Sequence, residues 1–220
     1  MKTVFCVLIV LFAVVAGSAQ NEQSPIVEKE IAYKNWKLKN VRGDGETELR
    51  DLAKGKKLLV VVYFAPWCPN WRHDAPMLER FYEKYKTNGL EIVGVSEYDT
   101  VDAAKANLDT LKVTFPVVSE SLARTEKQNT THYAYRKSTG DSRNWGSPWY
   151  ILLEPALLEK DGDILVKKTS VINGEMIEGE GEKFIRQKLG LPAEETKATA
   201  KAGEIDACDP EKKTVELKKP

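Results

Sequence analysis

The hydrophobic positions of residues 58–189 change repeatedly between the period of strands and the period of helices. Leu58 to Phe64 is a continuous run of β-branched and aromatic residues, which is typical of a strand covered on both faces of a sheet. Leu90 to Ser96 has the same apolar character. Between these runs, apolar residues recur at helical spacing from Leu78 to Tyr85 and predict an amphipathic helix that ends at Gly89.

The chain after residue 100 continues this alternation. We predict a helix over Val101–Leu111, a strand over Phe115–Val118, a strand over Trp149–Leu153, a hairpin turn at Asp161-Gly162 into a strand over Ile164–Val166, and a helix over Glu180–Leu189. Residues 119–146 are polar and are predicted as a helix followed by an irregular segment.

The order of these elements predicts an α/β fold. Strands that alternate with helices, followed by two strands and a helix, are typical of a parallel core sheet with an antiparallel edge. Helices are then expected on both faces of this mixed sheet. A further short strand is predicted upstream, over Trp36–Val41, and a turn follows it at residues 42–45.

The first nineteen residues have the features of a secretory signal peptide. A positive charge at Lys2 precedes an apolar run from Val4 to Val15, and the small residues Gly17, Ser18 and Ala19 follow. The alternative is an uncleaved membrane anchor, but a spanning helix needs about 20 apolar residues. We therefore expect cleavage after residue 19 and an exported protein, periplasmic or secreted, that does not stay in the membrane.

The remaining boundaries follow from composition. Residues 20–33 are polar and are expected to form a flexible lead-in, and residues 34–190 carry the predicted elements of one domain. Residues 191–220 are rich in Lys, Glu, Ala and Thr. Such a segment buries too little apolar surface to offset its ordering entropy, so we expect a disordered charged tail.

Charge and cysteine content exclude several function classes. Lys and Arg together number 33, as do Asp and Glu, so the formal net charge is zero. The chain has no global basic field to recruit nucleic acid and no global acidic field to recruit a basic partner. Beyond Cys6 in the apolar leader, the chain has two cysteines, Cys68 and Cys208, which do not make a disulfide framework. Any function must therefore be argued from a local site.

Cys68 is the strongest candidate for chemistry. It stands where the buried strand ending at Phe64 gives way to the following helix. Unpaired N–H groups and the positive end of the helix dipole at such a position favour a thiolate over a thiol. The alternative is that Cys68 is a small buried residue without reactivity.

The segment from Phe64 to Pro76 resembles exported TlpA-type and redoxin proteins, the AhpC/TSA-related branch of the thioredoxin-like superfamily. The family motif is Trp-Cys-x-x-Cys-Arg-x-acid-x-Pro, and the matching residues here are Trp67, Cys68, Arg72, Asp74 and Pro76. The resemblance covers about residues 34–190. It implies a thioredoxin-like fold with Cys68 as the nucleophile and Trp67 beside it.

A second segment strengthens the resemblance. Ser147-Pro148 matches the loop in which the family places a cis-proline against the nucleophilic cysteine. The resemblance therefore implies that Pro148 is cis and shapes the substrate groove. Without it, Pro148 is an ordinary proline that opens a strand.

The chain departs from the family at the positions that complete the chemistry. Trp71 replaces the second cysteine, whose thiol would attack the mixed disulfide and release the substrate. Val62 stands where thioredoxin has a buried acid that assists proton transfer, and Ala65 replaces the threonine that peroxiredoxins need. Cys68 can thus perform the first half of dithiol exchange without a local partner for the second.

Other candidate residues have two interpretations each. Arg72 and Asp74 either orient groups around Cys68 or are solvated charges in the first helical turns. Cys208 is a remote resolving thiol that reaches Cys68, a handle for another chain, or incidental. The tryptophans of the motif and loop, Trp67, Trp71, Trp145 and Trp149, form either an exposed aromatic surface or, as we expect, part of the packing.

The two histidines raise the question of a metal. Copper chaperones of the Sco type use this fold with two cysteines and one histidine, and here one soft ligand is absent. His73 near Cys68 is expected to be a solvated helix residue, and His132 has no evident cysteine partner. We therefore expect neither a metal nor another cofactor.

The leading hypothesis is an extracytoplasmic thiol–disulfide protein that acts through Cys68 alone on thiol- or disulfide-containing proteins or small thiols. The principal alternative is an inactive thioredoxin-fold module that binds a peptide or protein beside Pro148. A Cys68–Cys208 disulfide relay is a third possibility, and a peroxidase or copper chaperone is less favoured. The sequence names no substrate and no oligomeric state.

Overall fold

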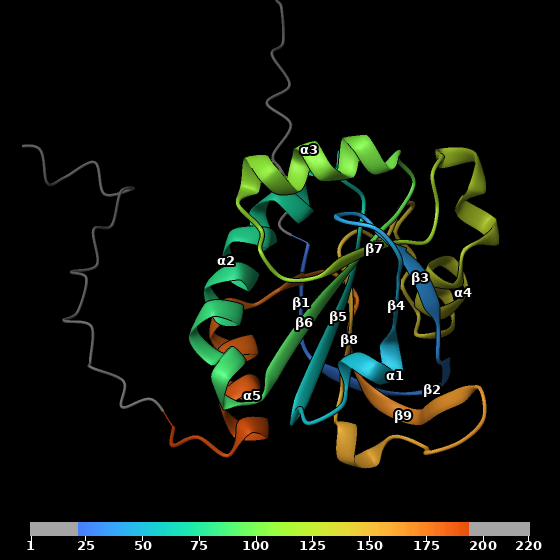
Figure 1. Cartoon of the computed structure of the whole chain (residues 1–220). Helices are drawn as coiled ribbons and strands as arrows, with labels where there is room; N and C mark the ends of the chain where they lie inside the picture. The colour runs from blue at the N-terminus through green and yellow to red at the C-terminus, as the bar shows by residue number, and fades with distance from the viewer. Residues whose placement is uncertain (1–21, 194–220) are drawn as a thin grey trace, which may run out of the picture.

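The buried strand predicted at residues 58–64 lies in the middle of a mixed sheet (Figure 1). The computed structural model describes residues 22–193. In it β5 (Leu58–Phe64) pairs in parallel with β6 (Leu90–Ser96) and antiparallel with β8 (Trp149–Leu153). The expected signal peptide, Cys208 and nearly all of the expected tail lie outside the described residues.

The sheet has eight strands in the order β2-β9-β8-β5-β6-β7-β3-β4. The outer members are β2 (Val27–Lys34), β9 (Ile164–Ile172), β7 (Val117–Ser119), β3 (Lys37–Asn40) and β4 (Glu46–Glu48). Strands β5, β6 and β7 form the parallel core, and every other neighbouring pair is antiparallel. A separate parallel pair joins β1 (Gln23–Ser24) to β10 (Glu175–Met176). The predicted mixed α/β architecture is confirmed.

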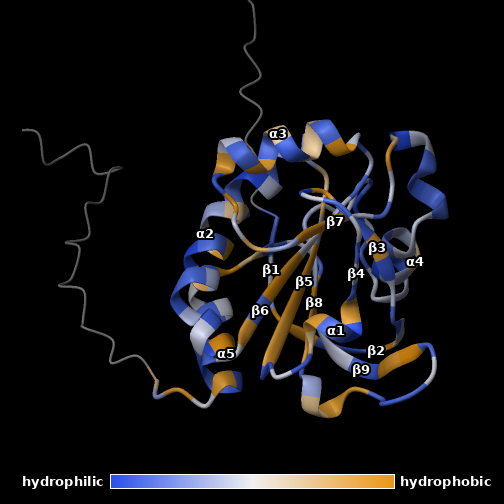
Figure 2. Cartoon of the chain, in the orientation of Figure 1, coloured by the Kyte–Doolittle hydropathy of each residue, from blue (hydrophilic) through white to orange (hydrophobic). Residues whose placement is uncertain are grey.

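Helices cover both faces of the sheet (Figure 1). One face packs against α2 (Pro69–Tyr85), α3 (Val101–Leu111) and α5 (Glu178–Leu189), and the other against α1 (Leu49–Leu52) and α4 (Thr131–Ser138). Short 3₁₀ turns occupy Lys86–Asn88, Arg124–Asn129 and Pro155–Leu157. The central strands are the most apolar part of the chain in Figure 2, and the helices are polar on their outer sides.

The period of two along β5 divides the core between these faces. Val60, Val62 and Phe64 belong to the cluster under α2 and α5, whereas Val61 and Tyr63 belong to the opposite cluster. All seven residues of β5 are fully buried. A strand with two buried faces needs the continuous apolar run that the sequence shows.

The flexible lead-in expected for residues 20–33 is wrong. Val27–Lys34 is an eight-residue strand that pairs antiparallel with β9 at one edge of the sheet. Ile31 and Tyr33 point into the core, and the exposed residues Glu30, Ala32 and Lys34 alternate with them. With few apolar positions, such an edge strand resembles a polar linker in composition. The folded domain therefore begins before residue 34.

Two smaller expectations also change. The hairpin predicted at Asp161-Gly162 is a longer connection that includes the 3₁₀ turn at Pro155–Leu157, and β9 runs on to Ile172. Residues 119–146 do contain a helix, α4, which begins where the Thr130 hydroxyl accepts a hydrogen bond from the Tyr133 N–H at 3.0 Å.

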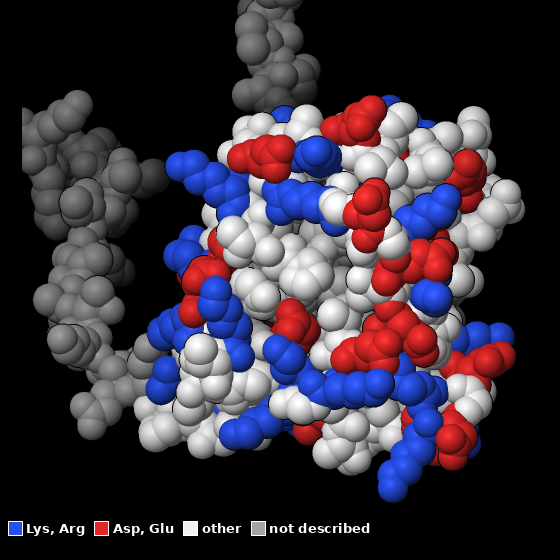
Figure 3. All heavy atoms as spheres, viewed as in Figure 1, with Lys and Arg blue, Asp and Glu red and all other residues white. Residues whose placement is uncertain are grey.

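The surface agrees with the balanced composition. Acidic and basic side chains are interspersed on the face shown in Figure 3. Within residues 22–193, no helix combines the length and apolar character that crossing a bilayer would require.

We expect Gly94→Ala to destabilise the fold by about 1–3 kcal/mol, the usual cost of overpacking a core. A Cβ at Gly94 would lie 2.9 Å from the Phe64 ring and 3.1 Å from Val117. The Phe64 ring cannot move aside freely because it stacks on Trp71. Urea denaturation of the wild type and variant measures the change.

Gly179→Ala is the matched control, because nothing lies within 4 Å of a Cβ built at Gly179 in α5. Its stability should stay the same or rise slightly. Equal losses at both positions would contradict the packing argument.

Candidate functional site

Cys68 is the N-cap residue of α2, and Pro69 occupies the first helical position. The Cys68 N–H donates to the Ala65 carbonyl at 2.9 Å, which forms the turn between β5 and α2. Cys68 is 7% exposed. Its placement at the start of a helix is therefore as the sequence predicts, and most of its surface is covered.

The loop before β8 closes over the thiol. Cys68 Sγ donates to the Ser147 carbonyl at 3.2 Å, and the Ser147 hydroxyl accepts from the Ala65 N–H at 2.9 Å. The Ser147–Pro148 peptide bond is cis, as predicted. The structure thus brings Cys68 and the Ser147–Pro148 loop together, although 79 residues separate Cys68 from Ser147.

Arg143 holds the backbone of this loop. Its guanidinium donates to the Pro148 carbonyl at 2.7 Å and to the Ser147 carbonyl at 3.4 Å. The same side chain forms ion pairs with Asp141 and Glu22, each at 2.9 Å. Sequence reasoning missed Arg143 because it lies in the polar segment that carried no periodic signal.

A cavity of about 300 Å³ opens beside the thiol. Cys68, Asn70 and Arg143 contribute to its wall, and so do Trp67 and Trp145, whose rings meet edge to face with centroids 5.1 Å apart. The cavity is therefore partly aromatic and carries Arg143 together with its ion-pair partner Glu22. Trp67 lies at the site, as expected from the motif.

Trp71 belongs to the core. Its indole is fully buried, stacks on Phe64 with ring centroids 3.9 Å apart, and donates to the Asn107 side chain of α3 at 2.9 Å. Trp149 is also fully buried, so packing is the main role of these two tryptophans, as expected. The position of the family's second cysteine has become part of the contact between α2, β5 and α3.

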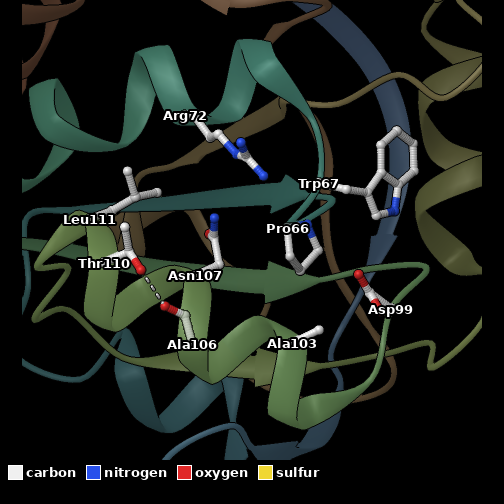
Figure 4. Close-up of a pocket in the computed structure, with 9 residues that line it drawn as sticks. All are labelled: Pro66, Trp67, Arg72, Asp99, Ala103, Ala106, Asn107, Thr110 and Leu111. Atoms are coloured by element: carbon white, nitrogen blue, oxygen red, sulfur yellow. Dashed lines mark hydrogen bonds between the residues drawn. The ribbon is translucent and has the colours of Figure 1, made fainter.

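Arg72 and Asp74 differ in their exposure to solvent. The Arg72 side chain is exposed and lines a second cavity of about 360 Å³ between α2 and α3, together with Trp67 and Asn107 (Figure 4). Asp74 is 1% exposed and accepts from the Tyr150 hydroxyl at 2.5 Å and the Met176 N–H at 2.9 Å. The solvated interpretation is thus wrong for Asp74, whose pKa is raised by burial.

The two histidines lie in different groups. His132 is fully buried, with Nε2 3.1 Å from the Gly146 carbonyl and Nδ1 2.9 Å from the Tyr98 hydroxyl. Burial holds the pKa of His132 well below its usual range, and nearby Arg136 lowers it further. Neutral His132 therefore donates from Nε2 to Gly146 and accepts at Nδ1 from Tyr98. It supports the loop that covers Cys68.

A pair of acids lies beyond the ends of β6 and β7. Glu97 is fully buried and accepts a hydrogen bond from the Ser121 hydroxyl, while Glu120 accepts from the Thr131 N–H at 2.5 Å and the His132 N–H at 3.3 Å. Burial, and then Glu120, raise the pKa of Glu97 well above its usual value.

Protonation explains the hydrogen bonding of this acid pair. If Glu97 were ionised, its buried Oε1 would receive no hydrogen bond from any of the described residues. A protonated Glu97 can donate to Glu120, and the pair then anchors the start of α4. In the sequence, Glu97 directly follows the predicted strand at 90–96. This position could have suggested a buried acid, but sequence reasoning did not use it.

Comparisons with known proteins agree with the thioredoxin-like fold. A model of the AhpC/TSA family matches residues 31–140, half of the chain. Thioredoxin-2 of Saccharomyces cerevisiae is 40% identical over 60 residues, which are 27% of this chain and 57% of that protein. The thiol-disulfide oxidoreductase ResA of Oceanobacillus iheyensis is 30% identical over 111 residues, which are 49% of this chain and 56% of that protein. The chain thus spans little more than half the length of these relatives.

Solved structures show the same fold. A thiol:disulfide interchange protein of the thioredoxin family from Chlorobium tepidum superposes with a TM-score of 0.53 at 18% identity, over 74% of this chain and 98% of that one. A secreted thiol-disulfide isomerase from Corynebacterium glutamicum superposes with a TM-score of 0.52 at 14% identity, over 74% and 92%. At these identities the likeness concerns the fold alone.

We expect Glu97→Gln to stabilise the protein at pH 8, because the folded chain must there hold a proton on Glu97 that the unfolded chain releases. Because the folded-state pKa of Glu97 is raised, its favourable contribution is complete below the unfolded pKa and declines as pH rises toward the folded pKa. Glutamine keeps an acceptor for Ser121 and a donor for Glu120 without titrating.

Urea denaturation at pH 5 and pH 8 tests this expectation. The gain in unfolding free energy should be larger at pH 8 than at pH 5. Asp44→Asn, an exposed acid in the turn between β3 and β4, is the control. A gain independent of pH would show that Glu97 does not carry the extra proton.

Proposed function

This chain belongs to the AhpC/TSA family, and from that premise we propose that it is an exported thiol–disulfide exchange protein that uses Cys68 as its single nucleophile. The observation that carries the proposal is the placement of Cys68 Sγ. The sulfur lies at the start of α2, 3.2 Å from the Ser147 carbonyl, on the wall of a cavity. Export is proposed from the leader-like residues 1–19.

The chemistry needs one disulfide and one external thiol. The Cys68 thiolate attacks one sulfur of the substrate disulfide, so that a Cys68–substrate disulfide forms, the substrate S–S bond breaks, and the other sulfur leaves as a thiolate. The leaving thiolate takes a proton from solvent. An external thiolate then attacks the mixed disulfide, forms a new disulfide with the bound substrate half and restores the Cys68 thiolate.

The surroundings of Cys68 suit the first of these steps. Cys68 is the N-cap residue of α2, so its sulfur stands at the positive end of the helix dipole. Before reaction, the Ser147 carbonyl accepts a hydrogen bond from the Cys68 thiol. The cavity beside Cys68 supplies room for a substrate sulfur, and the Trp67–Trp145 pair offers it an apolar wall.

The second step has no local thiol. In α2 the residue that shares a helical face with Cys68 three positions on is Trp71, which is buried against Phe64 and Asn107. We therefore propose that a small thiol or a protein thiol completes turnover. Cys208 lies outside the described residues, and its participation stays a prediction.

The same replacement favours a second candidate function. With the second-cysteine position converted to core and Cys68 only 7% exposed, the fold can serve as a module that binds a peptide or protein at the cavity without covalent chemistry. The two candidates differ in whether a covalent Cys68 intermediate forms.

We expect the chain from residue 20 onward to form a mixed disulfide with a peptide disulfide, and Cys68→Ser to abolish it. Because Trp71 cannot release the adduct, it should accumulate until reduced glutathione is added. Intact-mass spectrometry with peptide mapping measures the adduct. Cys208→Ser is the matched control and should keep the Cys68 adduct.

Failure of native Cys68 to react, under conditions in which the urea-unfolded chain does react, would overturn the exchange proposal. Retention of a bound peptide by Cys68→Ser with undiminished affinity would then support the binding module.

Trp71→Cys should lower the stability of the fold by about 3–5 kcal/mol, since it removes a fully buried indole. It also places a second thiol on the helical face of Cys68. Catalysed reduction of insulin disulfides by this variant, together with its urea midpoint, measures both effects. Trp71→Ala, which leaves a slightly larger cavity and no thiol, is the control and should show only the loss of stability.

A further inference from the structure

Three potential metal ligands meet between α2 and β10. His73 Nδ1 lies 3.4 Å from Asp74 Oδ1 and 3.5 Å from Glu175 Oε2, and the three ligand atoms all lie within 4.8 Å of one another. His73 and Asp74 are neighbours on α2, whereas Glu175 comes from β10. The pairing of β10 with β1 and a hydrogen bond from the Glu175 N–H to the Glu22 carbonyl at 3.0 Å fix the position of Glu175.

The two carboxylates are buried while the histidine faces solvent. The side-chain exposures are 1% for Asp74, 7% for Glu175 and 66% for His73. Asp74 uses Oδ2 for the Tyr150 hydroxyl and the Met176 N–H, and this leaves Oδ1 directed at His73. The carboxylate of Glu175 accepts no hydrogen bond from any residue that the structure describes, and its one ion-pair contact is His73.

A carboxylate that is largely withdrawn from water and receives no hydrogen bond from the protein is stabilised by a bound cation. Within this cluster His73 is the one cationic partner of the two carboxylates among the described residues. Arg143, whose charge also acts on Glu175, forms its ion pairs with Asp141 and Glu22. The cluster is therefore short of positive charge.

Two of the three separations between ligand atoms suit a tetrahedral ion, and the third, between the Asp74 and Glu175 oxygens, lies within 4.8 Å. Zinc binds histidine nitrogen and carboxylate oxygen at about 2.0–2.2 Å, and tetrahedral ligands at such bond lengths stand about 3.3–3.6 Å apart. The separations from His73 Nδ1 to the two oxygens are 3.4 and 3.5 Å. We propose that His73, Asp74 and Glu175 form a binding site for a divalent cation of the zinc class, with a fourth position open to solvent.

This site is distinct from the thiol chemistry. Its donors are one imidazole and two carboxylates, which suit zinc and cobalt ions, and Cys68 supplies none of them. A bound ion would join α2 to the β1–β10 pair by coordinate bonds. Because the ion binds the folded chain, it should also raise the thermal midpoint of unfolding.

Cobalt(II) is the probe for the first measurement. The untagged chain from residue 20 onward, with Cys68→Ser and Cys208→Ser to remove thiol ligands, is titrated with Co²⁺ and followed by visible absorption. We expect one equivalent to produce the d–d bands of a tetrahedral N/O site and Zn²⁺ to displace it. The thermal midpoint should rise with Zn²⁺.

Variants assign the ion to its ligands. His73→Ala and Glu175→Gln should each weaken Co²⁺ binding at least tenfold and remove the Zn²⁺-dependent rise of the midpoint. Glu178→Gln, an exposed acid three residues from Glu175, is the control and should bind as the parent does. Circular dichroism checks that each variant is folded.

Two results would overturn the proposal. One is the absence of saturable Co²⁺ binding to the folded parent. The other is undiminished binding by His73→Ala, whose exposed side chain can be removed without disturbing the core. Either result leaves the proposed exchange at Cys68 unaffected, since the parent here lacks that thiol.

Discussion

The pairing of β5 with β8 is the constraint on which the site depends. Their antiparallel register places Tyr63 opposite Trp149. The residues that follow β5 and the residues that precede β8 must then lie side by side. Ser147 fastens this junction, because its hydroxyl accepts from Ala65 and its carbonyl accepts from Cys68. A shift of this register would separate the Cys68 thiol from the Ser147–Pro148 loop even if α2 kept its position.

A polar network holds the loop against the opposite side of the sheet. Arg136 is fully buried and donates to the carbonyls of Arg143 and Asn144 at 2.7 and 2.9 Å. Gly146 has a φ of +62°, and a Cβ there would lie 2.4 Å from the Arg136 side chain. Glycine is required at this position for both reasons. The segment 119–146 is thus ordered by buried charge and not by a regular apolar pattern.

That contrast explains what could be predicted from the sequence. The elements over 58–64, 90–96, 101–111 and 149–153 have the predicted bounds, because strong apolar periodicity or a continuous buried run marks each one. The family motif located Cys68 and Pro148. The strand at 27–34 was missed because its inward residues, Ile31 and Tyr33, are few.

Groups assembled by tertiary pairing left no local signal. Glu175 and His73 are 102 positions apart in the chain, and only the packing of β10 on α2 brings them together. Glu97 and Glu120 are similarly joined by the parallel neighbours β6 and β7. Spacing in a sequence can suggest ligands on one helix, but it cannot show which acid arrives from a distant strand.

The edge strand β2 has a consequence for the behaviour of many copies together. Its outward residues include Glu28, Glu30 and Lys34, all exposed along the open side of the sheet. A β2 strand of another molecule that paired with β2 would place its own charged side chains against these residues and would have to remove their bound water. The charged side chains of β2 therefore discourage two copies of this protein from joining their sheets edge to edge through this strand.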